Sequence, residues 1–321
     1  MRIGINPEKE KSIKLQYKLH RIIIPVYIPN DDNDYFKDLD QVFYSNITSL
    51  LKTVDTNQTN ITIINNNSKQ EVTDYIDKLL HDKLIDKHIK YSTNYGKVYT
   101  ILQEARGCYE YYITIADADV FFFNNWQRNV QNVFENYKYA GVVGLTPDPH
   151  MAFYCNNSLW FDSFFKIKKG CIVDEKDLEL FEKGINKKDF FVIKKNNWKK
   201  KHYFIEKNGL KVVVGASHFA STYRKEIFEK LPFKKPIYVF PGGELTFLDT
   251  PADQLGFHRV SLTKAFAYHM GNTILEPDSF GELQNATLNT TNEVKKIRYS
   301  CIVTYSIKHY FVKVIRKFYN Y

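Results

Sequence analysis

Segments that indicate buried β-strands alternate with segments at helical spacing through the first 120 residues of the chain. The strand-like segments are 21–28, 61–64, 87–91 and 111–116, and the helical ones between them are 35–51, 70–80 and 97–105. Such alternation is typical of βαβ units, which build a parallel sheet covered by helices. The sequence therefore predicts the α/β class.

Three of these predicted strands end in turns that could hold a ligand. The three strand ends are Pro25–Asn30, Asn65–Ser68 and Asp117–Asp119. Ligands of parallel sheets gather at the carboxyl ends of the strands, at one edge of the sheet. We therefore expect all three turns to open onto one crevice.

The second half of the chain is less regular. It suggests strands at 139–145, 212–215 and 264–269 and helices at 224–230 and 250–260. The Lys-rich stretch 166–201 is polar and only weakly periodic, so it is interpreted as an excursion or a flexible region. A glycine turn is expected after 236–243, and a helical tail from 294 to 321.

The sharpest chemical feature is the run Ile113–Val120, in which an apolar strand ends in Asp117-Ala118-Asp119. Two carboxylates so close together repel each other and lose solvation. A bound Mg²⁺ or Mn²⁺ explains such a pair, since both cations prefer oxygen ligands. A solvated loop at the end of a strand is the structural alternative.

At this point the sequence resembles the GT-A glycosyltransferases, in particular the inverting family 2. The resemblance rests on the order of five motifs over about residues 20–275. These are Ile23–Tyr27, Ile63–Ser68, Asn94–Lys97, Asp117–Asp119, and His218–Ala220 with Tyr223-Arg224. It implies a GT-A fold, with a mostly parallel sheet and flanking helices. It also implies transfer of a sugar from a nucleotide-sugar donor to a hydroxyl of a glycan or lipid-linked acceptor, with inversion at the anomeric carbon. We predict that the donor is UDP-linked.

The resemblance also implies a domain organisation. The GT-A domain would span residues 1–280, with the nucleotide-sugar-binding half at about 20–145 and the acceptor half at about 146–280. Residues 281–321 would form a basic amphipathic extension.

The donor-binding residues implied by the resemblance lie mainly in the first half. They are Pro25, Val26, Tyr27, Asn65, Asn67, Lys97, Asp117, Ala118, Asp119 and His218. The family often has an Asp in the turn after the second strand, where this chain has Asn65–Asn67. An amide both donates and accepts hydrogen bonds, so this departure leaves the identity of the base open.

A metal site with Mn²⁺ or Mg²⁺ is expected at Asp119, with Asp117 assigned to the ribose. His269 follows a predicted strand, and many GT-A enzymes place a late histidine at the metal or the diphosphate. Neutral imidazole is a competent ligand, so His269 is the second predicted ligand. A satisfied structural histidine is the alternative.

An inverting transferase needs a carboxylate to deprotonate the acceptor hydroxyl. The candidates lie in the segment 241–255. Asp253 can be explained as the N3 residue of a helix that begins with Thr250 and Pro251. Asp249 has no such explanation, so we predict Asp249 as the base and keep Asp253 and Glu244 as alternatives.

The chain has a net charge of +9, and no acidic residue follows Glu293. Residues 297, 301, 305, 308 and 312 recur at helical spacing among lysines and arginines. A basic amphipathic helix can lie in a membrane interface, and a helix packed on the body is the alternative. The N-terminus has no apolar signal segment and no stretch is long enough to span a bilayer, so we expect a cytoplasmic location, at the inner face of the membrane if the tail docks there.

Other protein classes share parts of this pattern. A strand ending in DxD also describes the nucleophile strand of haloacid-dehalogenase-like phosphatases, but that motif usually lies near the start of the domain. Nucleotidylyltransferases usually have a Gly-rich loop after the first strand, and Pro25–Asp34 contains no glycine. A carbohydrate- or nucleotide-sugar-binding protein without turnover stays open. No nucleic-acid partner is expected, because the basic residues cluster in the tail without a recognised motif.

Overall fold

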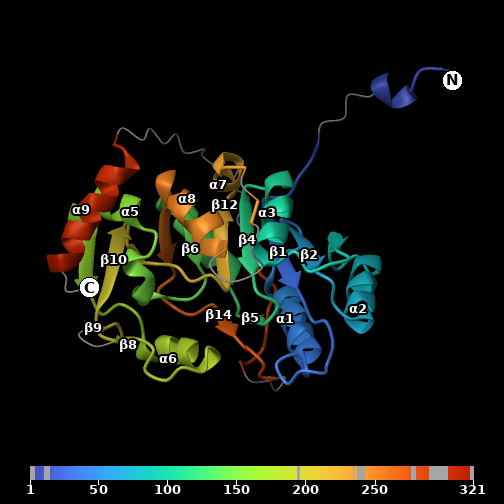
Figure 1. Cartoon of the computed structure of the whole chain (residues 1–321), viewed down its shortest axis with the longest axis horizontal. Helices are drawn as coiled ribbons and strands as arrows, with labels where there is room; N and C mark the ends of the chain where they lie inside the picture. Colours follow the sequence, from blue (N-terminus) through green and yellow to red (C-terminus); the bar gives the residue numbers. More distant parts are fainter. Residues whose placement is uncertain are drawn as a thin grey trace.

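The computed structural model describes residues 4–10, 15–193, 196–233, 235–236, 243–275, 280–288 and 303–318. A twisted ten-stranded sheet forms the centre of this part of the chain (Figure 1). In pairing order the strands are β3 (Lys87–Lys90), β2 (Thr59–Asn65), β1 (His20–Val26), β4 (Tyr112–Ala116), β12 (Ala220–Arg224), β6 (Ala140–Gly144), β13 (His258–Ser261), β11 (Leu210–Val214), β10 (His202–Lys207) and β7 (Ile167–Gly170). The first four of these strands run parallel, and the other half of the sheet mixes both directions.

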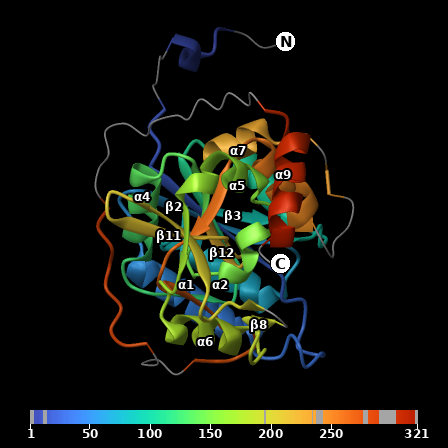
Figure 2. The ribbon, with the colours of Figure 1, turned by 90° about the vertical axis from the view of Figure 1, so that its left-hand side faces the viewer.

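Helices cover both faces of the sheet, as Figures 1 and 2 show. The alternation of side chains along β1 explains this arrangement. Ile22 and Ile24 pack into the core formed with α1 (Leu39–Thr53), α2 (Gln70–His81) and α4 (Trp126–Asn136). Ile23 packs into the opposite core, with α3 (Lys97–Gly107), α7 (Lys225–Lys230) and α8 (Thr250–Gln254). The predicted α/β class is therefore confirmed.

The predicted helix 250–260 is wrong in its second half. Helix α8 ends at Gln254, and the positive φ of Gly256, 89°, turns the chain away from the helical path. Residues His258–Ser261 then form β13, which is buried along its whole length between β6 and β11. Burial of every residue hid the alternation that identifies a strand.

The stretch 166–201 is also structured, contrary to the expectation of an excursion. It contains β7, α6 (Glu175–Gly184), β8 (Val192–Ile193) and β9 (Asn196–Asn197). The side chain of Asp174 caps α6 by accepting a hydrogen bond from the amide of Lys176. Leu178 and Phe181 bury one face of this helix, while its charged residues mask the amphipathic pattern.

The helical tail is confirmed for α9 (Tyr305–Phe318), which packs against α5 (Asn157–Ser163). The predicted helical positions 297 and 301 lie outside the described residues, as does most of 236–243. Residues 280–288 run along the body, where Leu288 donates its amide hydrogen to Asp55. The predicted boundary at residue 280 stays a prediction. Within the described residues, no helix is both long and apolar enough to cross a membrane.

Shorter elements complete the fold. They are the helical turns η1 (Pro7–Glu10), η2 (Pro149–Phe153), η3 (Phe164–Lys166) and η4 (Leu245–Asp249), and a second, two-stranded sheet of β5 (Val120–Phe122) and β14 (Ala267–His269). This small sheet joins the segment that follows Asp119 to the strand that ends in His269.

Candidate functional site

A cavity of about 1070 Å³ opens at the carboxyl ends of β1, β2 and β4. The parallel register places Val26 beside Asn65, so the turns after β1 and β2 lie side by side. Pro25–Ile28, Asn66 and Asp117–Asp119 line the cavity, with α1 on one side and the end of α6 on another. The expectation that the three strand ends share one crevice is confirmed.

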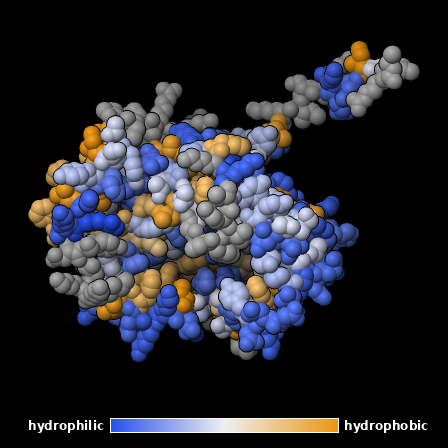
Figure 3. Space-filling view, in the orientation of Figure 1, coloured by the Kyte–Doolittle hydropathy of each residue, from blue (hydrophilic) through white to orange (hydrophobic). Residues whose placement is uncertain are grey.

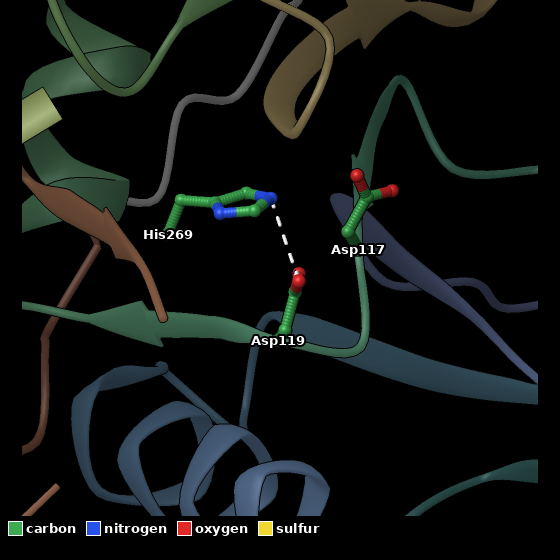
Figure 4. A group of neighbouring side chains, drawn as sticks. All are labelled: Asp117, Asp119 and His269. Atoms are coloured by element: carbon green, nitrogen blue, oxygen red, sulfur yellow. Dashed lines mark ion pairs between the residues drawn. The ribbon is translucent and has the colours of Figure 1, made fainter. Parts of the chain in front are cut away.

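Pairing of β5 with β14 brings two distant parts of the sequence together at this cavity. His269 is the register partner of Val120, and the amide of Met270 donates to the carbonyl of Asp119 at 2.7 Å. The imidazole of His269 consequently reaches the carboxylate of Asp119, as Figure 4 shows. The contact depends on β5, which has only three residues and begins directly after Asp119. The sequence analysis did not predict so short a strand at this position.

Asp117, Asp119 and His269 form a cluster whose ligand-type atoms lie within 4.8 Å of one another. The Nδ1 atom of His269 lies 3.3 Å from the carbonyl oxygen of Gly184, which can only accept a hydrogen bond. In the neutral imidazole, Nδ1 therefore carries the proton, and Nε2 directs its lone pair at Oδ2 of Asp119, 3.4 Å away. Two acceptor atoms face each other, an arrangement that a proton or a cation between them stabilises.

The carboxylate of Asp119 fits a metal ligand in two further respects. Its Oδ1 atom is buried and has no hydrogen-bond partner within the described part of the chain. Burial raises the pKa of Asp119 to about 6, an effect that His269 opposes and Asp117 reinforces. A cation bound by this carboxylate and the imidazole would give the unpaired Oδ1 atom a partner and would stabilise the ionised form of Asp119. The residues present therefore fit Mn²⁺ or Mg²⁺.

The loop that carries the two aspartates is held from behind by α1. Asn46 is fully buried, and its amide donates to the carbonyl oxygens of Val120 at 2.6 Å and Asp117 at 3.3 Å. The amide of Asp117 donates to the carbonyl of Phe219 in turn. These bonds fix the loop on both sides, and nothing in the spacing of the sequence identified Asn46 as their source.

Lys97 is one of the lysines that line the cavity. Its ammonium group forms ion pairs with Asp117 and, at 3.3 Å, with Glu244. Burial alone would lower the pKa of Lys97, but the two carboxylates outweigh it and raise the pKa. The lysine is thus held in the charged form at the wall of the cavity.

The turn after β2 presents Asn66 to the cavity, between the two asparagines that the sequence analysis named. The amide of Asn65 donates to Thr73, and its oxygen accepts from Ser68, so that side chain is committed to the turn. Asn67 is exposed and has a positive φ of 73°, as the turn requires. Asn66 bonds to Asn94 and to the amide of Tyr95 at the cavity wall.

Asp249, the predicted base, is fully buried beneath the site. Its carboxylate pairs with the guanidinium of Arg259, lies 3.2 Å from Nδ1 of His218 and accepts a hydrogen bond from Tyr154. His218, which belonged to the predicted donor-binding set, faces a small hollow shared with Lys97 and Glu244. Burial lowers the pKa of His218, and Asp249 opposes that effect.

Asp253 is committed to the N-terminus of α5. Its two oxygens accept hydrogen bonds from the amides of Asn157 and Ser158, at 2.9 and 2.8 Å, and from the hydroxyl of Tyr305 at 2.9 Å. Glu244 is the one of the three predicted carboxylates that lines the cavity. The geometry therefore favours Glu244, which the sequence analysis kept as an alternative.

The end of α6 supplies a wall that sequence reasoning missed. Lys183, Gly184, Ile185 and Asn186 all line the cavity. They belong to the stretch interpreted as an excursion. The spacing of Leu178 and Phe181 before Gly184 was a signal that a helix ends there, but the charged residues around them weakened it.

Comparison with known proteins adds a family. The model of "Glycosyl transferase family 2" matches residues 22–232, a span that includes Asp117 and Asp119 and ends before Glu244 and His269. A search of curated proteins finds no match.

Among solved structures, the chain resembles the mannosyltransferase PcManGT from Pyrobaculum calidifontis in complex with GDP-Man and Mn²⁺, at 10% identity and a TM-score of 0.43 over 79% of this chain and 58% of that chain. It also resembles S. aureus TarS 1-349 in complex with UDP-GlcNAc, at 11% identity and a TM-score of 0.43 over 81% and 63% of the two chains. The matched part is 58–63% of the length of these chains.

Proposed function

Because this chain belongs to glycosyl transferase family 2, we propose that it transfers a hexose from a nucleotide-sugar donor to a hydroxyl group of a glycan or lipid-linked acceptor. The predicted family is confirmed, and the phosphatase alternative falls with it. The observation that carries the proposal is the cluster of Asp117, Asp119 and His269 on the floor of a cavity that a nucleotide sugar would fill.

The proposed donor position follows from the cavity walls. Pro25, Val26 and Tyr27 would bound the nucleoside, and Asn66 takes the role first given to Asn65 and Asn67, because its side chain lies at the cavity. Asp117 would accept hydrogen bonds from the ribose hydroxyls, and Lys97 would attract the diphosphate. UDP is our proposed nucleotide. Beyond its bonds to Asn94 and Tyr95, Asn66 keeps one N–H and one oxygen lone pair, with which it can both donate to and accept from the edge of a uracil.

Asp119 and His269 would hold the divalent cation, Mn²⁺ or Mg²⁺. When bound, the cation would supply positive charge to the leaving diphosphate. The backbone at Asp119 is already fixed for this role, because Asn46 and Met270 donate hydrogen bonds to the carbonyl oxygens of Val120 and Asp119.

Glu244 is the proposed base. The ion pair with Lys97 lowers the pKa of Glu244 against the opposing effect of burial, so its carboxylate is ionised at neutral pH. It would take the proton of the acceptor hydroxyl while that oxygen forms a bond to the anomeric carbon. The bond from the anomeric carbon to the phosphate oxygen breaks, and the nucleoside diphosphate leaves with the electron pair. Inversion is proposed for this single displacement.

Calorimetric titration with UDP, GDP, CDP and ADP, with and without Mn²⁺, tests the donor site. We expect one nucleotide to bind with Mn²⁺, and Asp119→Asn to reduce its affinity by about 10- to 100-fold. Asp74→Asn, an exposed carboxylate on α2, is the matched control. Failure of every nucleotide to bind to the folded protein would contradict the proposal.

The base is tested with Glu244→Gln in a sugar-transfer assay. The expected result is a loss of kcat by about 10²- to 10⁴-fold with nucleotide affinity retained, because a proton acceptor is removed while the shape is kept. Glu71→Gln on α2 is the control. Tight donor binding without turnover in the wild type, over a broad acceptor panel, would favour the binding protein without turnover.

A further inference from the structure

Helix α9 has an apolar inner side that is already satisfied. Val312 and Ile315 are buried in the main core, and Phe311 packs on Phe161 and Phe164. Lys308 is also turned inward, where it pairs with Asp162 at 3.1 Å. These contacts account for the attachment of the helix to the body without using its outer side.

The outer side carries a second apolar stripe. Its members share an exposed position at spacings of three or four residues, and they are Ile307 (56% exposed), Tyr310 (69%), Val314 (37%) and Phe318 (81%). Phe165, on the adjoining turn η3, is 98% exposed. We call these five residues the α9 patch. Figure 3 shows hydrophobic residues among hydrophilic ones along the left edge of the molecule, where Figure 1 places α9.

Positive charge borders the α9 patch. Lys313 and Lys317 are exposed on the same helix, Lys166 is exposed next to Phe165, and within the described residues none of the three pairs with a carboxylate. The chain has no Asp or Glu after Glu293. Large apolar side chains exposed at neighbouring positions of one helix face mark an interaction site.

We propose that the α9 patch docks on an anionic lipid surface. The apolar stripe would enter the boundary between headgroups and acyl chains, and the lysines would contact negatively charged headgroups. A second copy of this chain fits less well, because the cationic borders of two such patches would repel each other. A nucleic acid would leave the aromatic and aliphatic side chains of the stripe without a function.

Sedimentation with lipid vesicles tests the proposal on the full chain. Vesicles of phosphatidylcholine alone are compared with vesicles that contain phosphatidylglycerol, at low and high salt. We expect binding only to the anionic vesicles and a decrease at high salt, because the headgroup attraction is screened. Equal binding to both kinds of vesicle, or no binding at low salt, would overturn the proposal.

Two double variants separate the contributions of charge and stripe. Lys313→Glu with Lys317→Glu, and Tyr310→Ser with Phe318→Ser, should each weaken vesicle binding at least about tenfold. The charge control is Lys78→Glu with Lys83→Glu on the far side of the molecule, and the apolar control is Ile5→Ser, at a residue 79% exposed. The controls should bind vesicles as the wild type does.

Two further measurements keep the interpretation unambiguous. Metal-dependent nucleotide binding should be unchanged in every variant, so a failure of the lipid proposal is distinguishable from a failure of the proposed function. Light scattering after size exclusion reports self-association. A wild-type dimer that the patch variants convert to monomers, without any vesicle binding, would overturn the lipid proposal in favour of a second copy.

Discussion

The carboxylate of Asp249 pairs with the guanidinium of Arg259, and neither side chain is exposed to solvent. The guanidinium also donates to the carbonyl oxygen of Ala216 at 3.0 Å. Burial would lower the pKa of Arg259, but Asp249 outweighs it and raises that pKa. The pair joins η4, which carries Asp249, to β13 in the central sheet, and this gives Asp249 a role in holding the fold together beneath the site.

We therefore predict that Asp249→Ala destabilises the protein by about 3–5 kcal/mol, because the Arg259 charge is left buried without a partner. Urea unfolding measures the loss. Replacing both residues with apolar ones, Asp249→Leu with Arg259→Met, should cost less than Asp249→Ala alone. A variant Asp249→Ala that unfolds at the wild-type midpoint but has lost transfer activity would restore Asp249 as the base.

Asp253 connects α8, α5 and α9, since its carboxylate accepts from Asn157, Ser158 and Tyr305. Asp253→Ala removes the acceptor for two amides of α5 and should lower stability by about 1–3 kcal/mol. Tyr305→Phe removes one of these bonds and should cost about 1 kcal/mol. Hydrogen exchange should accelerate in α9 in both variants, and unchanged exchange there would show that α9 is held without this link.

The sequence predicted the first half of the fold well, because its parallel strands are apolar runs that end in polar turns. Local sequence patterns were enough to predict two of its features. These are the strand β1, with Ile22–Ile24, and the Asp117–Asp119 turn after β4. The cavity at the strand ends then followed from topology. The antiparallel half was harder, since β12 and β13 contain polar residues that are buried in contacts with distant parts of the chain.

The roles of acidic residues depended on such distant contacts. Asp249 and Asp253 lie five and nine positions after Glu244, yet their carboxylates meet Arg259 and the start of α5, while Glu244 lines the cavity. Helical position alone could explain Asp253 as a structural residue, and the structure places it in that role with different partners. No local pattern could identify Arg259 as the partner of Asp249.

The burial of His20 leads us to predict that the free energy of unfolding depends on pH. It is buried, where Gln127 donates to its Nδ1 atom and its Nε2 atom bonds to Thr114 at 2.7 Å. Burial lowers the pKa of His20 to about 3, against an ordinary value of 6.5. Between these two values the unfolded chain binds a proton that the folded chain does not, so stability falls as the pH falls below 6.5.

The contribution of His20 should amount to about 2 kcal/mol between pH 7.5 and 5, at about 1.4 kcal/mol per pH unit below 6.5. Chemical unfolding across this range should show a shallower loss of stability for His20→Gln than for the wild type. His81→Gln, whose imidazole is exposed, should keep the wild-type slope. Identical slopes for His20→Gln and the wild type would show that His20 does not contribute.

Gly184 predicts that α6 controls the position of His269. A Cβ atom on Gly184 would lie 2.4 Å from the carbonyl oxygen of His269, which is backbone and cannot move by a simple side-chain rotation. Gly184→Ala must therefore separate the end of α6 from β14 and displace the imidazole from Asp119. We expect Mn²⁺-dependent nucleotide binding to weaken by about tenfold or more, since the orientation of the imidazole as a metal ligand is disturbed.

Gly107→Ala is the matched control, because Gly107 also lies at the end of a helix, α3, and its Cβ would meet no atom within 4 Å. Calorimetric titration should show wild-type affinity for Gly107→Ala. If Gly184→Ala also binds the nucleotide with wild-type affinity, then this contact does not position His269, or His269 does not bind the metal.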